Sequence, residues 1–183
     1  VRSMSAALGS SAEVSAAAFR PRAAVALRLE GFRVSVEARA RSLLAELGGL
    51  EGLAAPEASW LEDAESAQLW QAFGAVHALA DSPVVWRLSV PPSAAARVIE
   101  RLAPEDYLLD WGGGLIWIGA RDADAGRVRG AIESGHATLV KAPAEVRAAC
   151  SVFQPPPAPL AEALGRLKAA FDPDGRLNPG RMD

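Results

Sequence analysis

The chain has 183 residues, of which 50% are hydrophobic, and a formal net charge of −3 at pH 7. That length and apolar content are enough for a buried core, so we expect a soluble globular protein. Arginine is interspersed with aspartate and glutamate instead of forming a basic run, which argues against a nucleic-acid partner. Because no apolar stretch reaches the roughly 20 residues that span a bilayer, we predict no transmembrane segment.

The cysteine and histidine content argues against a disulfide or a metal site. Cys150 is the single cysteine, and His77 and His136 are the two histidines. We interpret Cys150 as a small buried hydrophobe, with a redox role as the alternative, and we predict no metal site. The first residues carry no secretory signal, which favours a cytoplasmic location. Because the chain begins with Val1, we expect it to be a piece of a longer protein.

The N-terminal half shows one strand and two helical patterns. Residues 23–30 alternate apolar and charged side chains, and this alternation is typical of a half-buried strand with Arg28 on its polar side. Ser35 is expected to cap a helix that ends at residues 48–49. Residues 61–80 predict a second helix, which stops at an Asp-Ser-Pro segment.

The second half predicts a strand over residues 84–90, with Trp86, Leu88 and Val90 on one face and Arg87 on the other. The elements expected after it are a helix capped by Ser93, strands over 107–111 and 115–118 joined by a glycine turn at 112–114, a helix from Asp122, and a strand over 137–141. This order favours an α+β fold: an antiparallel sheet with helices on one face, of the ferredoxin-like kind.

The tail has a different character from the rest of the chain. Residues 153–159 are proline-rich and predict an extended connector, and residues 160–171 have the apolar spacing of an amphipathic helix. Two turn sequences follow at 172–175 and 178–180. We therefore expect an ordered, docked C-terminal arm.

Few residues stand out as carriers of chemistry, and none is assigned a catalytic role. The glycines at 112–114 lack the spacing and the following helix of a phosphate loop, so a hairpin turn is expected. Arg28 and Arg87 are expected on the helix-free face, where they either meet an anion or are solvated surface residues. His136 is expected to be buried and hydrogen-bonded, with a catalytic role as the alternative. Trp111, Trp117 and Tyr107 are expected in the core.

The closing segment, Phe171 to Met182, resembles the C-terminal signature of FAD-linked oxidases of the vanillyl-alcohol-oxidase superfamily. The form that ends in Gly-Arg-Met is similar to the FAD-binding subunits of glycolate oxidases. Other segments that look like those subunits are Ala7-Leu8-Gly9-Ser10, Leu27-Arg28-Leu29-Glu30-Gly31, Trp86-Arg87-Leu88-Ser89, Asp110-Trp111-Gly112-Gly113-Gly114 and His136-Ala137-Thr138-Leu139-Val140. The resemblance spans nearly the whole chain.

The resemblance implies a two-domain flavoprotein that binds FAD mainly through an N-terminal domain absent from this chain. Residues 1–22 would be a connector from that domain, 23–150 a cap domain over the flavin ring, and 151–183 a connector, helix and flavin-side tail. Asn178, Gly180 and Arg181 would lie near the flavin. Arg28, Arg87 and His136 would face the substrate or another anion.

The resemblance also implies partners. These are a homologous catalytic flavin subunit and an iron–sulfur subunit, which together oxidise glycolate or another small 2-hydroxy acid and pass electrons to a membrane acceptor. Such partners would allow a location peripheral to the inner membrane. The histidine-rich motif of related catalytic subunits is missing here, so this subunit would relay electrons or support assembly. The alternative is a non-enzymatic ferredoxin-like module that binds a ligand or a protein through its open sheet face.

Overall fold

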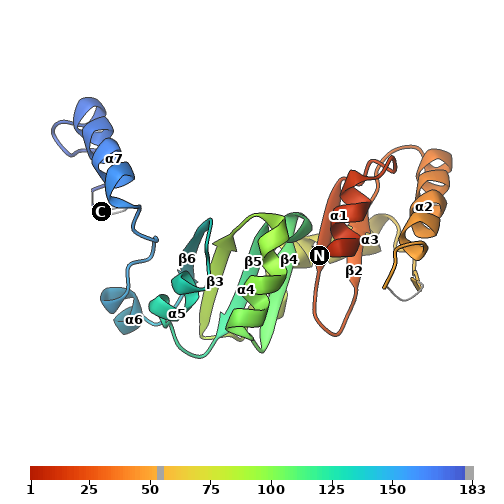
Figure 1. The fold of residues 1–183 in the computed structure, drawn as a ribbon, viewed down its shortest axis with the longest axis horizontal. Coiled ribbons are helices and arrows are strands. Elements are labelled where there is room, and N and C mark those ends of the chain that lie inside the picture. Colours follow the sequence, from red (N-terminus) through yellow and green to blue (C-terminus); the bar gives the residue numbers. More distant parts are fainter. Residues whose placement is uncertain (53–55, 180–183) are drawn as a thin grey trace.

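Strand β3 (Val84–Ser89) lies inside a six-stranded, entirely antiparallel sheet and pairs with β5 on one side and β6 on the other. The computed structural model describes residues 1–52 and 56–179. The strand order is β2-β1-β4-β5-β3-β6, of which Figure 1 shows the run β4-β5-β3-β6 side by side. The other strands are β1 (Ala16–Phe19), β2 (Val25–Arg28), β4 (Asp106–Asp110), β5 (Leu115–Ala120) and β6 (His136–Lys141).

The four strands from β4 to β6 form a split βαβ unit. Along the chain the order is β3, α4 (Ala95–Leu102), β4, β5, α5 (Ala125–Gly130) and β6, and in the sheet the strands stand as β4-β5-β3-β6. This is the ferredoxin-like arrangement, in which two crossover helices lie on one face of an antiparallel sheet. The predicted α+β class and the antiparallel sheet are confirmed.

The core lies between this sheet and α4 and α5. Trp86, Leu88 and Ile116 are fully buried, and Val98 of α4 and Val128 of α5 pack against them in one cluster. Burying a large apolar side chain of this kind stabilises a fold by about 1.5–3 kcal/mol. The predicted inward face of residues 84–90 is therefore confirmed, and we call the opposite side of the sheet the open face.

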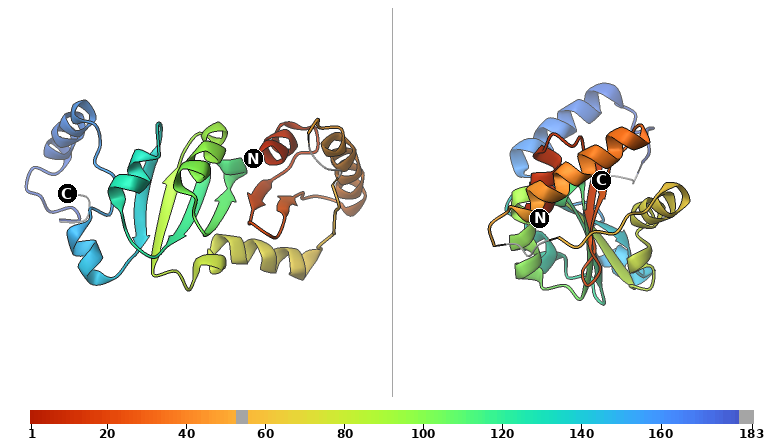
Figure 2. Two further views of the ribbon diagram at one scale, coloured as in Figure 1. Left: turned by 60° about the horizontal axis from the view of Figure 1, so that its bottom comes forward. Right: turned by 90° about the vertical axis from the view of Figure 1, so that its right-hand side faces the viewer.

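The open face is not free along its whole length. A short 3-10 turn, η1 (His77–Leu79), lies against it, because Leu79 is buried and approaches Gly119 of β5. Helix α3 (Asp63–Gly74), which precedes η1, lies on the side of the sheet opposite α4 in the right-hand view of Figure 2. The prediction that all helices lie on one face is therefore wrong for α3 and η1, which lie on the opposite face from α4.

Residues 1–22, expected as a connector, contain a helix and a strand. Helix α1 (Arg2–Gly9) packs on β1 and β2, and its Met4 is fully buried in the main core cluster. Ala7 joins a second, smaller cluster with residues of α2 (Arg33–Gly48). Strand β1 joins β2 to β4, so this segment adds one strand to the sheet and connects β2 to it.

Three predicted helix starts are wrong by a few residues. Helix α2 begins at Arg33, two residues before Ser35, and Ser93 lies inside a 3-10 turn, η2 (Pro92–Ala94), that precedes α4. Asp124, and not Asp122, caps α5 by accepting a hydrogen bond from the Arg127 amide at 2.9 Å. Local propensity marks the region of a helix start better than its first residue.

The proline-rich connector begins by covering the outer edge of β6. The Leu139 amide donates to the Val152 carbonyl at 2.9 Å, and the Ala137 amide donates to Gln154 Oε1 at 2.9 Å. Between β6 and this segment lies α6 (Ala144–Ala149), which the sequence did not predict. An edge strand with free amides is a site of unwanted pairing, so this cover protects the sheet.

Helix α7 (Ala158–Phe171) forms as predicted but extends away from the sheet (Figure 1). None of its residues is buried, and its apolar stripe is exposed at Leu160 (51%), Leu164 (47%), Leu167 (54%) and Phe171 (78%). Residues 151–154 therefore dock on β6, whereas α7, which belongs to the arm expected to dock, buries no residue against the described chain. None of the described helices is long and apolar enough to cross a membrane.

Gly135 offers a test of the β3–β6 register. Its φ is +120°, and a Cβ there would overlap the Ser89 carbonyl oxygen. We expect Gly135→Ala to lower the free energy of unfolding by about 1–3 kcal/mol, measured by urea denaturation. The control is Gly165→Ala in α7, where a Cβ meets nothing within 4 Å and alanine favours the helix. Equal stability of the two variants would contradict the assignment.

Candidate functional site

The part of the open face that η1 leaves free lies over β3, β5 and β6. Arg87 of β3 stands directly opposite Trp117 of β5 on one side and Thr138 of β6 on the other. Ser89 stands opposite His136 in the next open-face row. Side chains that face each other across antiparallel strands lie on the same face, so these residues form one cluster.

Arg87 is held between two tryptophan rings. Its guanidinium carbon lies 5.6 Å from the ring centroid of Trp111 and 5.9 Å from that of Trp117. Both distances are within the range of a cation–π interaction. Among the residues that the structure describes, no hydrogen bond or ion pair to the Arg87 side chain accompanies these ring contacts. The half-buried cation therefore keeps its N–H donors available.

Trp111 reaches Arg87 from the turn between β4 and β5. It has a φ of +52°, which is uncommon for a bulky residue, and its amide donates to Asp110 Oδ1 at 2.7 Å. Gly112 and Gly113 follow with φ of +66° and +106°. The predicted glycine turn is thus confirmed as a tight 3-10 turn. A Cβ at Gly112 would collide with Leu8, so α1 supports the turn from behind.

Two of the three aromatic residues expected in the core lie elsewhere. Trp111 is 59% exposed, and Trp117 is half-buried on the open face opposite Arg87. Tyr107 does pack against the core, beside Phe19, with ring centroids 6.2 Å apart. The alternation of β5 could have revealed Trp117, since Ile116 and Ile118 on either side of it point inward.

His136 is exposed, so its expected burial is wrong. Its position at the start of β6 turns its side chain to the open face beside Ser89. Sequence reasoning did not assign Ser89 and Thr138 to this cluster, because only the strand register brings them next to Arg87. Hydroxyl and imidazole groups next to a guanidinium add hydrogen-bonding capacity for a polar ligand.

Arg28 lies on the open-face side of β2 as predicted, but far from Arg87. Its neighbour across the ladder is Ala16, and strands β1, β4 and β5 separate β2 from β3. Four steps of about 4.8 Å between strands separate the two arginines by about 19 Å across the sheet alone. Arg28 also forms an ion pair with Glu30 at 3.0 Å. It therefore stands outside the Arg87 cluster.

The C-terminal turn is built on Asp172. Its carboxylate accepts hydrogen bonds from the Arg176 amide at 2.7 Å and the Leu177 amide at 2.9 Å, which confirms the predicted turn at 172–175. Asn178 follows, exposed and with a φ of +48°. Gly180 and Arg181, predicted to lie near a flavin together with Asn178, are outside the described residues.

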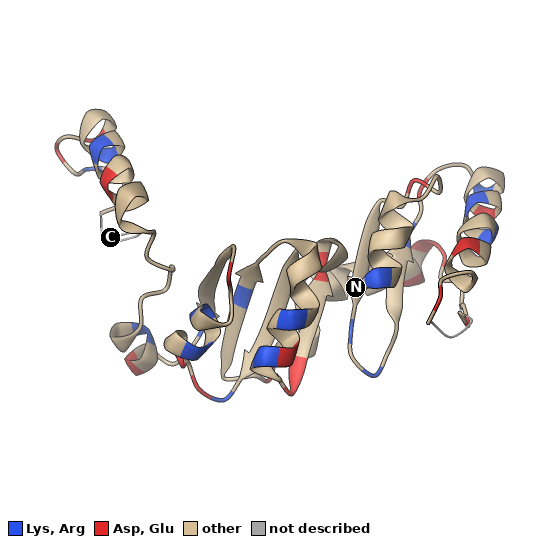
Figure 3. Cartoon of the chain, viewed as in Figure 1, with Lys and Arg blue, Asp and Glu red and all other residues tan. Residues whose placement is uncertain are grey.

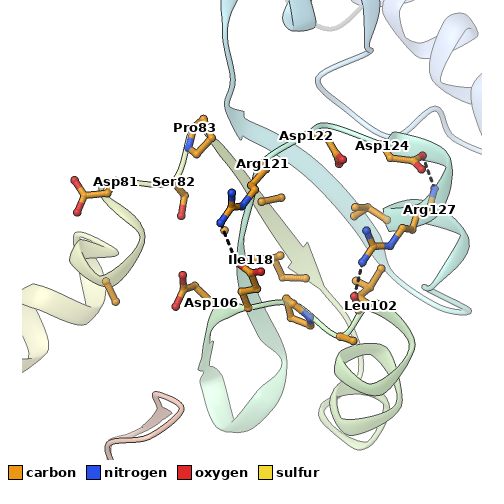
Figure 4. A pocket seen from close by; sticks show the side chains of 17 residues that line it. Asp81, Ser82, Pro83, Leu102, Asp106, Ile118, Arg121, Asp122, Asp124 and Arg127 are labelled. Carbon is orange, nitrogen blue, oxygen red and sulfur yellow. Dashed lines mark hydrogen bonds and ion pairs between the residues drawn. The ribbon is translucent and has the colours of Figure 1, made fainter.

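A cavity of about 670 Å³ opens at the other end of the sheet, below β4 and β5 (Figure 4). Acidic and basic side chains share its wall, and its cations have partners: the Arg127 guanidinium donates to the Leu102 carbonyl, and Arg121 pairs with Glu105 at 3.7 Å. The Asp124 carboxylate accepts from the Arg127 backbone amide. Figure 3 shows the same mixing of signs along α2 and α4. The unpartnered charges of this cavity among the described residues are the carboxylates of Asp81, Asp106 and Asp122, so the cavity offers no free guanidinium like that of Arg87. Cys150 is half-buried against the core cluster, not fully buried.

The comparisons with known proteins agree with the motifs. The predicted resemblance to glycolate oxidase subunits is confirmed. The chain is similar to "Glycolate oxidase subunit GlcE" of Escherichia coli (strain K12), with 36% identity over 99 residues. These residues are 54% of this chain and 25% of the relative, so the match spans about a quarter of that protein's length. No family model matches the chain, and no solved structure gives a significant match.

The Asp172 turn predicts a local effect on the tail. We expect Asp172→Ala to speed amide hydrogen exchange of Arg176 and Leu177, because each amide loses a hydrogen bond to a charged group, worth about 1.5–3 kcal/mol. Asp174→Ala is the control, since Asp174 only pairs with Arg176 at 3.2 Å on the exposed surface. Equal exchange in the two variants would show that Asp172 does not organise the turn.

Proposed function

We propose that this chain is the cap and C-terminal part of an FAD-dependent 2-hydroxy-acid oxidase subunit, with glycolate as the first substrate to test. The open face would cover the flavin ring and the substrate next to it. The observation that carries the proposal is Arg87, which contacts Trp111 and Trp117 and has no hydrogen-bond or ion-pair partner among the described residues, on the sheet face that α4 and α5 leave bare. The similarity to a glycolate oxidase subunit supports it.

The residues of this chain fit one side of a flavin and not all of it. Exposed indole surface and a guanidinium suit a planar, electron-accepting ring and the negative charge it gains on reduction. The pyrophosphate needs backbone amides at a helix N-terminus, and the only run of three glycines among the described residues is the turn at 112–114. FAD would therefore be held mainly by a domain outside this chain.

In this proposal the chain orients the substrate and shields it from water, while another domain holds most of the FAD. When bound, FAD supplies the acceptor for the electrons that leave the hydroxy acid. Arg87 would hold the substrate anion, Trp111 and Trp117 would exclude water around it, and Asn178, Gly180 and Arg181 would return to the flavin at the end of the arm. With no catalytic base assigned, the subunit would support oxidation or relay electrons together with a homologous catalytic flavin subunit and an iron–sulfur subunit. The subunit would lie in the cytoplasm or at the periphery of the inner membrane.

A non-enzymatic protein-binding module remains the second candidate, because one observation favours it. The exposed stripe of α7, from Leu160 to Phe171, has the spacing of a helix face that packs on a partner. The complete reading frame separates the two candidates. A flavin-binding domain encoded upstream of Val1 supports the oxidase, and a different domain or none supports the module.

The proposal predicts where the flavin is held. The purified 183-residue chain should be colourless and inactive, whereas a longer protein with the upstream domain should absorb at about 450 nm from bound FAD. In that longer protein Arg181→Gln should lower the FAD content per folded subunit. Arg176→Gln is the control, because Arg176 already pairs with Asp174. FAD bound to the short chain, or equal FAD content in both variants, would reject this assignment.

A further inference from the structure

We infer that Arg87, Trp111 and Trp117 form a receptor for the carboxylate of a small 2-hydroxy acid, in which Trp111 is a positioning residue. The carboxylate site rests on the geometry of this chain alone. The choice of a 2-hydroxy acid rests on the proposed function.

The first argument is the missing acceptor. Contacts with the faces of two indole rings stabilise the charge of Arg87 but give none of its N–H donors an oxygen acceptor. The other half-buried arginines among the described residues do have acceptors: Arg39 donates to the Glu30 carbonyl at 2.7 Å, and Arg129 donates to the Phe153 carbonyl at 3.1 Å. A half-buried guanidinium without an acceptor still has N–H donors to satisfy. A carboxylate fits this need, because its two oxygens can accept two parallel N–H groups of one guanidinium.

The second argument is the backbone of Trp111. A tryptophan with φ of +52° costs free energy, and the turn at Gly112 and Gly113 maintains it. The result is an indole that is 59% exposed and yet lies over Arg87. Backbone strain that exposes a large apolar side chain to solvent does not stabilise the core. Its effect is to limit the orientations of the guanidinium, which lowers the entropy lost when an anion binds.

The third argument is the spacing of the hydroxyl groups. Thr138 stands directly across from Arg87, at a Cβ separation of about 4.5–5.5 Å for such a pair. Ser89 is two residues along β3, about 6.8 Å away, with His136 beside it. A 2-hydroxy acid carries its carboxylate and hydroxyl on adjacent carbons. It can therefore bind Arg87 with one group and hydrogen-bond to Thr138 or Ser89 with the other.

The test is a titration of the 183-residue chain followed by NMR of its tryptophan indole N–H groups, which Trp111→Phe and Trp117→Phe assign. The probes are glycolate, acetate and chloride at constant ionic strength. We expect glycolate to shift the Trp111 and Trp117 signals, acetate to bind more weakly because it lacks the hydroxyl, and chloride to leave both unchanged. Equal responses to glycolate and chloride would overturn the receptor, and so would no response to glycolate.

Variants separate the roles. Arg87→Gln should weaken glycolate binding by about tenfold or more, the loss expected for a charge-assisted hydrogen bond. Trp111→Ala should also weaken it, while Trp111→Phe should restore most of the affinity. Arg121→Gln, at an arginine whose side chain is 89% exposed beyond the end of β5, is the matched control and should bind as the parent chain does. Circular dichroism verifies that each variant folds, and parent-like binding by Arg87→Gln would overturn the inference.

The receptor and the proposed function fail in different ways. If glycolate binds at Arg87 but a longer protein with the upstream domain carries no FAD, the proposed function is rejected and the receptor stands. If that protein carries FAD but Arg87→Gln does not alter glycolate binding, the receptor is rejected and the proposed function stands.

Discussion

The pairing of β3 with both of its neighbours determines the two sides of this molecule. All six residues of β3 pair with β5, and Arg87 to Ser89 pair in an unbroken register with β6. In this register Trp86 and Leu88 point to α4 and α5, whereas Arg87 and Ser89 point to the open face. A slip by one residue would exchange these sets, burying a guanidinium and exposing a tryptophan. The core therefore fixes the position of Arg87 as firmly as it fixes its own packing.

The split βαβ unit could be predicted because each of its elements carries its own signal. Strand β3 alternates, β5 is apolar, and glycine or proline stands at most of the boundaries. Strand β1 could not be predicted from its own residues: Ala16, Ala17 and Ala18 have low β propensity, and the strand forms because β2 and β4 offer backbone partners on both sides. Helix α1 was missed for a similar reason. Its few apolar residues are buried because α1 packs on the β1–β2 hairpin. This tertiary contact cannot be predicted from the local sequence pattern.

The candidate site was partly predictable from strand parity. Parity placed Arg28 and Arg87 on the open face correctly, but it could not show that three strands separate them, because strand order is a tertiary property. Hydrophobicity placed Trp111 in the core, whereas the positive φ of the turn directs it to the surface over Arg87. Residues at a turn escape the alternation rule that holds within strands. Functional side chains are often found at such exceptions, where a strained backbone presents a group that regular structure would hide.

Residues 152–157 of the tail first pair with the edge of β6 and then direct the chain away from the sheet. Val152 and Gln154 complete the hydrogen bonds of the β6 edge, and Arg129 anchors the same segment by donating to the Phe153 carbonyl at 3.1 Å. The prolines at 155–157 have no amide to donate, so pairing with β6 ends there and the chain departs. Helix α7 then carries its apolar stripe away from the core. A helix of 14 residues usually gains most of its stability from packing, yet none of the residues of α7 is buried against the described chain. The same short segment therefore covers the edge of β6 and leads the chain to α7. The prolines at 155–157 are the point where the hydrogen bonds to β6 end and the chain turns away from the sheet.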